Sequence, residues 1–316
     1  MLFSPPQLHI PDGFLTILVS LIFWVATIII VGVAILKTNQ SLGERQIPLM
    51  GVMAAFIFAA QMLNFPVAGG TSGHFLGGTL AAIVLGPWAG ILVMTAVVGV
   101  QALLFQDGGL LVMGANIFNM GIITAVIGFG LYRIVIHQKK GARLVTAGIG
   151  AWIATMTAAL ITSLQLWLSG TTRLEIVIPA MLGVHALIGI GESLITVAAL
   201  TFIAQTRPDL VETRKSAVDG GRGWIIAGVL VTLLAVLISP LASGNPDGLE
   251  RVAEDLGFLA TGFSAPFQIL PDYSIPFLGE TTISTILAGI VGVIVVLGIL
   301  ILMGRNLYKP KEIEVK

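Results

Sequence analysis

Long apolar runs separated by short polar segments dominate the chain. A helix needs about 20 apolar residues to cross the roughly 30 Å hydrocarbon core of a bilayer. Seven runs are long enough to predict one spanning helix each: residues 14–36, 48–65, 112–132, 143–168, 178–204, 224–242 and 284–304. The pattern therefore predicts an all-α polytopic membrane protein.

The apolar stretch 75–105 is too long for one span and short for two. Only a Gly-Pro-Trp sequence at 86–88 interrupts it. Because proline ends one helix and readily begins the next, we predict two short helices, 75–86 and 88–105. The predicted number of membrane helices is then nine.

Basic residues test this number, because Lys and Arg stay preferentially on the cytoplasmic side. With nine spans and an external N-terminus, only Arg173 and Arg251 of the sixteen basic residues lie outside. One span fewer would place the basic segments 133–143 and 205–223 outside. We therefore expect a multi-pass protein of the cell membrane, with its N-terminus outside and its C-terminus inside.

The polar segment 205–223 divides seven predicted helices from two. We expect a domain boundary there, between a seven-helix region, 1–220, and a two-helix region with an outer loop, 221–316. The residues before the first span include no basic residue, which argues against a signal peptide.

The outer loop of the second region contains one short amphipathic pattern. Asn245 is expected to cap a helix that begins at Pro246 and ends at Gly257. An apolar stripe on this helix should rest on the protein. Its acidic residues could attract cations, but a solvated acidic face is favoured; they are Asp247, Glu250, Glu254 and Asp255.

The composition agrees with a membrane protein and limits its chemistry. Only 10% of the residues are charged, against about a quarter in soluble domains, and the mean hydropathy is +1.00. Sixteen basic residues balance sixteen acidic ones without a long basic run, so nucleic-acid binding is disfavoured. The absence of cysteine excludes disulfides, iron–sulfur clusters and thiol catalysis. Any metal site must use nitrogen and oxygen ligands.

Two of the four histidines are candidates for such a site. His9 lies just before the first predicted span, and His74 closes the glycine-rich segment 69–74. Both are expected on the outer side, so they can meet. A histidine at a helix N-terminus is biased towards the neutral form that binds metals. For either residue alone, the alternative is an interfacial side chain bonded to a loop, and His137 is expected to be solvated in a basic inner loop.

A series of short motifs runs through residues 8 to about 205. They are His9-Ile10-Pro11-Asp12-Gly13-Phe14-Leu15, Asn64-Phe65-Pro66, Gly69-Gly70-Thr71-Ser72-Gly73-His74, Gly77-Gly78-Thr79-Leu80, Leu85-Gly86-Pro87-Trp88-Ala89, Gln101-Ala102-Leu103, Asp107-Gly108-Gly109, Gly114-Ala115-Asn116 and Phe118-Asn119-Met120. Together they resemble the substrate-specific M component of nickel and cobalt energy-coupling-factor transporters, the CbiM/NikM family. Further along, Ser239-Pro240-Leu241-Ala242-Ser243 and Pro246-Asp247-Gly248-Leu249-Glu250 resemble the two-helix N component of these systems, a PDGLE domain of the CbiN/NikN type.

The resemblance implies the substrate-specificity subunit of an ATP-driven importer that captures Ni²⁺ or Co²⁺ on the outer face. A membrane T component and two cytoplasmic ABC-type ATPases would be its partners. The sequence contains no Gly-x-x-x-x-Gly-Lys-Ser/Thr, so we expect no ATPase site, no enzyme activity and no permanently bound cofactor. A secondary, ion-coupled metal transporter and a non-transport membrane anchor or sensor are the alternatives.

The resemblance also implies the metal ligands. They are the N-terminal amine, the amide and imidazole of the next residue, and a second histidine, which correspond here to Leu8, His9 and His74. The amine and amide close a five-membered chelate ring and the imidazole a six-membered one, and four such nitrogens suit Ni(II) or Cu(II). Because residues 1–7 precede Leu8, we favour initiation at position 8 over trimming or a different site with Asp12 or water as donor. The sequence leaves open whether the transported ion is nickel or cobalt.

Polar residues near the outer helix ends could orient the two histidine rings. The alternative is hydrogen bonding between helices. They are Gln61, Asn64, Gln101, Asn116 and Asn119. His185 and Glu192 are seven residues apart on one helix face, and a mutual or backbone hydrogen bond is favoured over metal handling.

Three small residues, Gly51, Ala55 and Ala59, recur at intervals of four residues and form a ridge on one predicted helix. The resemblance implies that such a ridge docks the T component. Ordinary packing within the chain is the alternative, because small residues permit close contact between any two helices.

Overall fold

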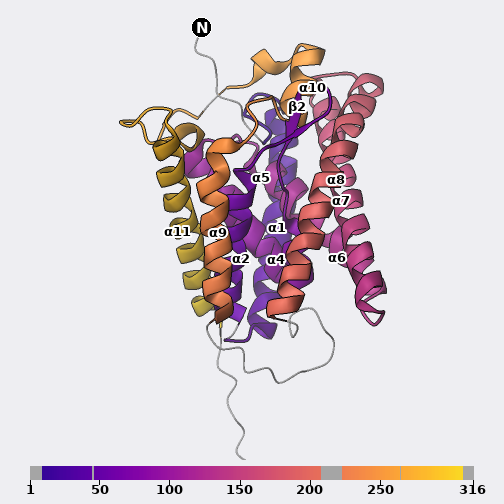
Figure 1. Cartoon of the computed structure of the whole chain (residues 1–316). Coiled ribbons are helices and arrows are strands. Elements are labelled where there is room, and N and C mark those ends of the chain that lie inside the picture. Colours follow the sequence, from indigo (N-terminus) through magenta and orange to yellow (C-terminus); the bar gives the residue numbers. More distant parts are fainter. Residues whose placement is uncertain (1–8, 45, 208–222, 264, 309–316) are drawn as a thin grey trace, which may run out of the picture.

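The computed structural model describes residues 9–44, 46–207, 223–263 and 265–308. Their helices stand side by side in one bundle (Figure 1). The elements are α1 (Ile17–Ser41), α2 (Gln46–Gln61), β1 (Phe65–Val67), β2 (Thr71–Gly73), α3 (Gly78–Leu85), α4 (Pro87–Val100), η1 (Gln101–Phe105), α5 (Met113–Asn116), η2 (Ile117–Ile123), α6 (Thr124–Ile134), α7 (Lys140–Leu168), α8 (Leu174–Thr206), α9 (Gly223–Ile238), η4 (Ser239–Leu241), α10 (Gly248–Leu256), η5 (Leu259–Thr261), η6 (Pro271–Tyr273) and α11 (Thr282–Leu307).

Seven helical segments among the described residues are long and apolar enough to cross a membrane. Large apolar side chains point outward along them, as on α1, where Ile17 and Ile28 are 71% and 61% exposed. Such continuous exposed apolar surface is typical of contact with lipid. The prediction of an all-α, multi-pass membrane protein is confirmed.

The chain between β2 and η1 contains two helices, as predicted. Gly86 separates them with a φ of +85°, and Pro87 begins the second. The first helix, α3, has eight residues and is shorter than predicted. It begins only after Gly77, whose φ is +84°, so the residues just before it are not helical. At 1.5 Å per residue, α3 extends about 12 Å and cannot cross a bilayer alone.

The last two long helices, α9 and α11, pack against α2. This arrangement favours the alternative of internal packing for the small ridge. Gly51, Ala55 and Ala59 are all buried in the chain itself. A side-chain carbon at Gly51 would lie 3.2 Å from the Ile301 Cγ1 atom of α11. The chain's own α11 therefore covers the ridge at Gly51, and the burial of the other two residues fits close helix packing within the chain.

The short amphipathic helix is α10, and its N-terminal cap differs from the prediction. The Asp247 carboxylate, not Asn245, caps the helix by accepting a 2.7 Å bond from the Glu250 N–H. Gly257 ends the helix in the left-handed region, as predicted. Asp247 is only 4% exposed, so the expectation of a solvated residue is wrong for this member of the acidic group.

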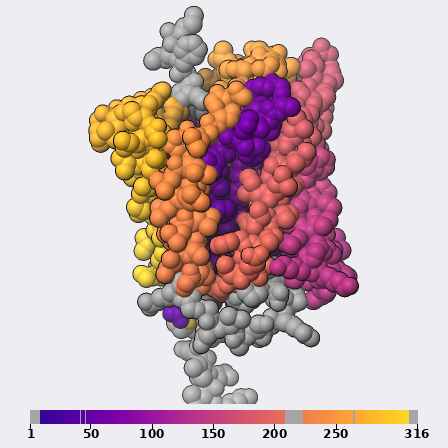
Figure 2. Space-filling model, viewed as in Figure 1, coloured from indigo at the N-terminus to yellow at the C-terminus, as the bar shows by residue number. Residues whose placement is uncertain are grey.

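An apolar groove of about 400 Å³ opens between α8 and α9. Figure 2 shows α2 at its floor, between these two helices. Apart from Thr206 and Arg207 its lining residues are apolar. The groove therefore offers no set of nitrogen and oxygen ligands. The end of the bundle that carries β2 and α10 is called the α10 end below (Figure 1).

Candidate metal site

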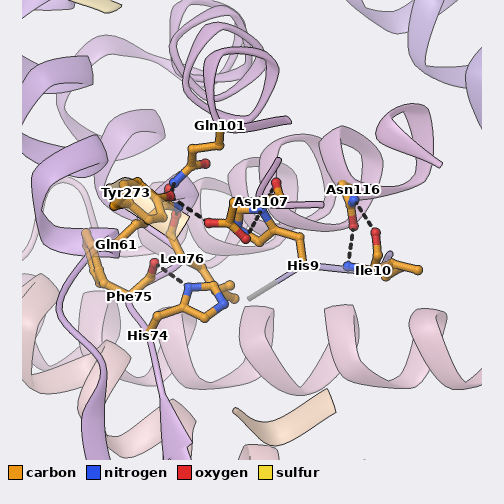
Figure 3. A network of polar contacts seen from close by, with 10 residues as sticks. All are labelled: His9, Ile10, Gln61, His74, Phe75, Leu76, Gln101, Asp107, Asn116 and Tyr273. Carbon is orange, nitrogen blue, oxygen red and sulfur yellow. Dashed lines mark hydrogen bonds and ion pairs between the residues drawn. The ribbon is translucent and has the colours of Figure 1, made fainter. Parts of the chain in front are cut away.

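His9 and His74 lie next to each other at the α10 end. Their ring centroids are 5.4 Å apart and the rings meet edge to face at 72° (Figure 3). Both side chains belong to buried residues. The segment before α1 and the loop after β2, far apart in sequence, thus bring two imidazoles together.

The segment that carries His9 is fixed through its backbone. The Asn116 carboxamide accepts a bond from the Ile10 N–H at 3.1 Å and donates one to the Ile10 carbonyl at 3.0 Å. This carboxamide acts as a clamp on the residue after His9. Of the polar residues expected to orient the rings, Asn116 is therefore one that acts through the main chain.

Asp12 also ties this segment to the bundle. Its carboxylate accepts bonds from the N–H groups of Leu110, Leu111 and Val112 at 2.9–3.2 Å. A side-chain carbon on Gly109 would come within 2.1 Å of this carboxylate, so the close approach requires glycine. Burial raises the pKa of Asp12, and the three N–H groups oppose that shift. Both oxygens are engaged, which argues against Asp12 as an alternative metal donor.

The His9 ring presents one nitrogen without a partner. Its Nδ1 atom lies 3.1 Å from the Asp107 carbonyl oxygen and 3.4 Å from the Asp107 carboxylate. Its Nε2 atom is buried and has no hydrogen-bond partner. Buried polar atoms are rarely left in this state, and an imidazole nitrogen in such a position fits a metal ligand.

This geometry differs from the chelate that the resemblance implies. A six-membered ring through the amide and the imidazole uses Nδ1, which here faces Asp107. Nδ1 can bind a metal only after the ring turns and gives up its contact with the Asp107 carbonyl. Leu8, the implied source of the amine, lies outside the described residues.

Main-chain contacts hold His74. Its Nδ1 atom lies 3.2 Å from the Phe75 carbonyl oxygen. The strand before it, β2, pairs with β1, and Ser72 at its centre donates to the carbonyl oxygens of Asn245 and Pro246. The Glu192 carboxylate binds the main chain directly after His74. The loop therefore contacts both α8 and the segment before α10.

Glu192 is the buried acceptor for two otherwise unpaired N–H groups. It accepts bonds from Leu76 at 2.6 Å and from Gly77 at 3.0 Å, just before α3 begins. The backbone hydrogen bond favoured from the sequence is what the structure has. His185, seven residues earlier, donates from Nδ1 to the Met181 carbonyl at 2.8 Å if it carries its proton there.

His9 and His74 face a small cavity of about 70 Å³. His185 and Asp247 line it as well, together with Asn116, Asn119, Thr155 and Thr162. Burial, with the charges of Glu250 and Asp107, raises the pKa of Asp247 well above its usual range. Within the part of the chain that the structure describes, no three His, Cys, Asp or Glu side chains form a metal-binding group. Side chains alone do not complete a site, so two imidazoles would need further donors.

Of the remaining polar residues predicted near the site, Asn119 and Gln61 make hydrogen bonds there, whereas the side-chain oxygen of Asn64 makes none. Asn119 lines the cavity and binds Thr162 and Gln165, and the Gln61 amide donates to the Leu76 carbonyl at 2.8 Å. Asn64 does not contact either histidine through its side-chain oxygen, which has no partner.

Two residues at the site were missed in the sequence. The Tyr273 hydroxyl donates to the Asp107 carboxylate at 2.6 Å and accepts from the Gln101 amide at 3.2 Å (Figure 3). Asp107 faces His9 in turn. Asp107 belongs to a conspicuous Asp-Gly-Gly motif, which is a usable signal, whereas nothing near Tyr273 in sequence points to a site 166 residues away.

Comparison with known proteins identifies the family. The profile of the family described as "Cobalt uptake substrate-specific transmembrane region" matches residues 9–210, and that of the PDGLE domain matches residues 222–309. The chain belongs to the CbiM family and carries a C-terminal PDGLE domain. The resemblance found in the sequence is thereby confirmed, and the chain is a member of a family of nickel and cobalt transport proteins.

Relatives of this CbiM-family chain share its two-part organisation or its first part. The "Putative fused nickel transport protein NikMN" of Archaeoglobus fulgidus is 36% identical over 92% of this chain and 96% of its own length. The "Fused nickel transport protein NikMN" of Rhodobacter capsulatus is 28% identical over the same shares, 92% and 96%. The crystal structure of a truncated transition metal transporter is 34% identical, covers 62% of this chain and 98% of its own, and superposes with a TM-score of 0.58.

Proposed function

We propose that this chain is the substrate-specificity subunit of an ATP-driven importer for Ni²⁺ or Co²⁺. Its α10 end would face the outside, with the N-terminus outside and the C-terminus inside. A membrane T component and two cytoplasmic ATPases would power transport. The family membership supports metal transport, and the basic residues in the segments opposite the α10 end support this orientation.

The observation that carries the proposal is the pair of buried imidazoles at one end of an apolar bundle. His9, through its unpartnered Nε2 atom, and His74 would bind the transported ion directly. Main-chain nitrogens of residues 8 and 9 would join the set only if the His9 ring turns and gives up its Nδ1 contact with Asp107, because that chelate uses Nδ1. Imidazole and amide nitrogens suit Ni(II) in a planar arrangement and give Mg(II) or Ca(II) no advantage. The buried, unpartnered His9 Nε2 atom supports a ligand role for this ring.

The small cavity limits what can be captured. A space of about 70 Å³ accommodates a bare or nearly dehydrated ion rather than an organic chelate. His185 and Asp247 would form the wall opposite the two ligands. We propose that this wall belongs to both parts of the chain, 1–220 and 221–316, because His185 comes from α8 and Asp247 precedes α10.

Uptake measurements separate this proposal from its rivals. The chain is placed in vesicles with and without the T component, the ATPases and ATP, and ⁶³Ni²⁺ uptake is followed. We expect uptake only with all partners and ATP. Uptake driven by an ion gradient alone would indicate a secondary transporter, and metal binding without uptake under any condition would indicate a sensor or anchor.

Two further measurements address the ion and the amine. Metal content of the natively purified chain, by mass spectrometry, distinguishes nickel from cobalt. N-terminal peptide analysis of the metal-loaded chain tests whether position 8 carries a free amine. Residues 1–7 on the metal-loaded form would contradict an amine ligand and require other donors beside His9 and His74.

A further inference from the structure

The loop before α11 reaches into the surroundings of His9. Tyr273 lies at the end of η6, and its ring stacks on Phe105 with centroids 4.6 Å apart and planes inclined by 18°. Its ring also lies beside the Phe58 ring, with the two ring centroids 6.0 Å apart. Tyr273 thus belongs to the C-terminal part of the chain but packs on α2 and η1 of the first part.

The hydroxyl of Tyr273 is engaged on both sides. It donates to the Asp107 carboxylate at 2.6 Å and accepts from the Gln101 amide at 3.2 Å. Burial and the Asp107 charge raise the pKa of Tyr273 well above its usual range, so the hydroxyl keeps its proton and donates it. Asp107 in turn lies 3.4 Å from the His9 Nδ1 atom. Figure 3 shows this continuous line of contacts from Gln101 to His9.

The backbone at this position is unusual. Asp272 and Tyr273 have φ values of 50° and 52°, the left-handed region that side chains other than glycine rarely adopt. Two adjacent residues in this conformation are unfavourable unless their surroundings hold them. The loop is tied on both sides, because the Leu270 N–H donates to the Leu104 carbonyl at 2.9 Å and the Ile275 N–H to the Ser284 hydroxyl at 2.6 Å.

Packing alone does not account for the hydroxyl. A phenylalanine would make the same stacking contact with Phe105 and would need no partner for a polar atom. The short bond to Asp107 instead restrains a carboxylate that faces His9. Groups that hydrogen-bond a metal-ligating imidazole fix its orientation, and groups one step further out fix those partners.

We propose that Tyr273 is a positioning residue for metal capture: by holding the Asp107 carboxylate against the His9 Nδ1 atom, the C-terminal part of the chain orients the ring of a ligand that belongs to the first part and binds the ion through Nε2. The inference rests on the proposed role of His9. It assigns the C-terminal part a direct influence on the affinity of the metal site.

The test compares Tyr273→Phe with the unaltered full-length chain in detergent. Ni²⁺ affinity is measured by calorimetry, and the Cu²⁺-loaded chains are compared by EPR, which reports the nitrogen ligands and their geometry. We expect about tenfold weaker Ni²⁺ binding and a changed Cu²⁺ spectrum, with a small fall in Tm because Asp107 and Gln101 lose a hydrogen-bond partner. Tyr308→Phe, which removes a hydroxyl at the other end of α11, is the matched control and should leave all three unchanged.

Three further variants make every outcome decisive. If Tyr273 acts through Asp107, Asp107→Asn should weaken binding and the double variant should bind no more weakly than Asp107→Asn alone. The inference would be overturned if the effects of the two substitutions on Ni²⁺ affinity were fully additive. Unchanged affinity and an unchanged spectrum in Tyr273→Phe would also overturn it, even if Tm falls. His9→Ala tests the proposed function separately: retained Ni²⁺ binding there removes His9 from the site, whereas lost binding there with normal Tyr273→Phe rejects only the role of Tyr273.

Discussion

His9 and His74 lie side by side but are held in different ways. Side chains place His9: Asn116 binds the backbone next to it, and Asp107 faces its ring. His74 is placed by the paired strands before it and by the Glu192 carboxylate, which accepts bonds from the N–H groups of Leu76 and Gly77 after it. Loss of one side chain near His9 should therefore weaken its placement in steps, whereas loss of Glu192 should disturb the whole loop that carries His74.

Removing a ligand should have the largest effect. We expect His74→Ala to abolish Ni²⁺ binding and uptake while the chain still folds and inserts, because the ring supplies a ligand and the paired strands and Glu192 hold the loop through its main chain. His137→Ala, an exposed histidine in the loop after α6, is the control. Binding by calorimetry and uptake in vesicles measure the effect, and unchanged uptake in His74→Ala would remove this residue from the site.

Glu192 tests how the loop of His74 is held. Glu192→Ala leaves the N–H groups of Leu76 and Gly77 without an acceptor inside an apolar bundle, at a cost of about 2–4 kcal/mol. We expect a lower Tm together with weaker Ni²⁺ binding. Glu192→Gln keeps one acceptor oxygen, so its Tm and Ni²⁺ affinity should lie between those of the unaltered chain and of Glu192→Ala. A normal Tm in Glu192→Ala with lost binding would instead indicate direct contact of Glu192 with the ion.

Asn116 tests the graded response expected for His9. Asn116→Ala removes both bonds to Ile10 but no ligand. We expect Ni²⁺ binding to weaken about tenfold and Tm to fall, because the buried Ile10 N–H and carbonyl lose their partner. Asn64→Ala, in which the lost amide oxygen had no partner, is the matched control. Equal effects of the two variants would show that amides at the α10 end contribute only to general stability.

The smallest predicted effect concerns pH. Partial removal from water, with the charges of Asp107 and Glu280, raises the pKa of Asp272 to about 7. The folded chain then binds a proton that the unfolded chain releases, so this residue lowers the free energy of unfolding as pH rises from about 4 to 7. We expect Asp272→Asn to flatten the dependence of Tm on pH in this range. Asp255→Asn, an exposed partner of Arg251, should not.

Much of the fold could be predicted because the bilayer imposes a simple length rule. The apolar runs identify the spans, and Gly86-Pro87 identifies the break within 75–105. The length of α3 could not be predicted, because it depends on the Glu192 carboxylate, which approaches from α8. Apolar composition alone does not show where the helical hydrogen bonds begin.

The site was predictable where its residues lie in motifs and hidden where they meet across the bundle. His9, His74 and Asn116 each stand in a motif. Tyr273 stands in none, and its contact with Asp107 depends on how the loop before α11 folds back. The role of the ridge on α2 stays a prediction for a similar reason, since the sequence does not say which helix covers a row of small residues.

The bonds of Ser72 with Asn245 and Pro246 join the two parts of the chain beside His74. Sixteen residues separate the end of α8 at Thr206 from the start of α9 at Gly223. A tether this short holds its ends at an effective concentration on the order of millimolar. As separate polypeptides, the two parts would meet in proportion to their abundance in the membrane. The fused chain carries both at a fixed ratio of one to one, so under the proposed role of Tyr273 every copy of the metal site would have its C-terminal part beside it.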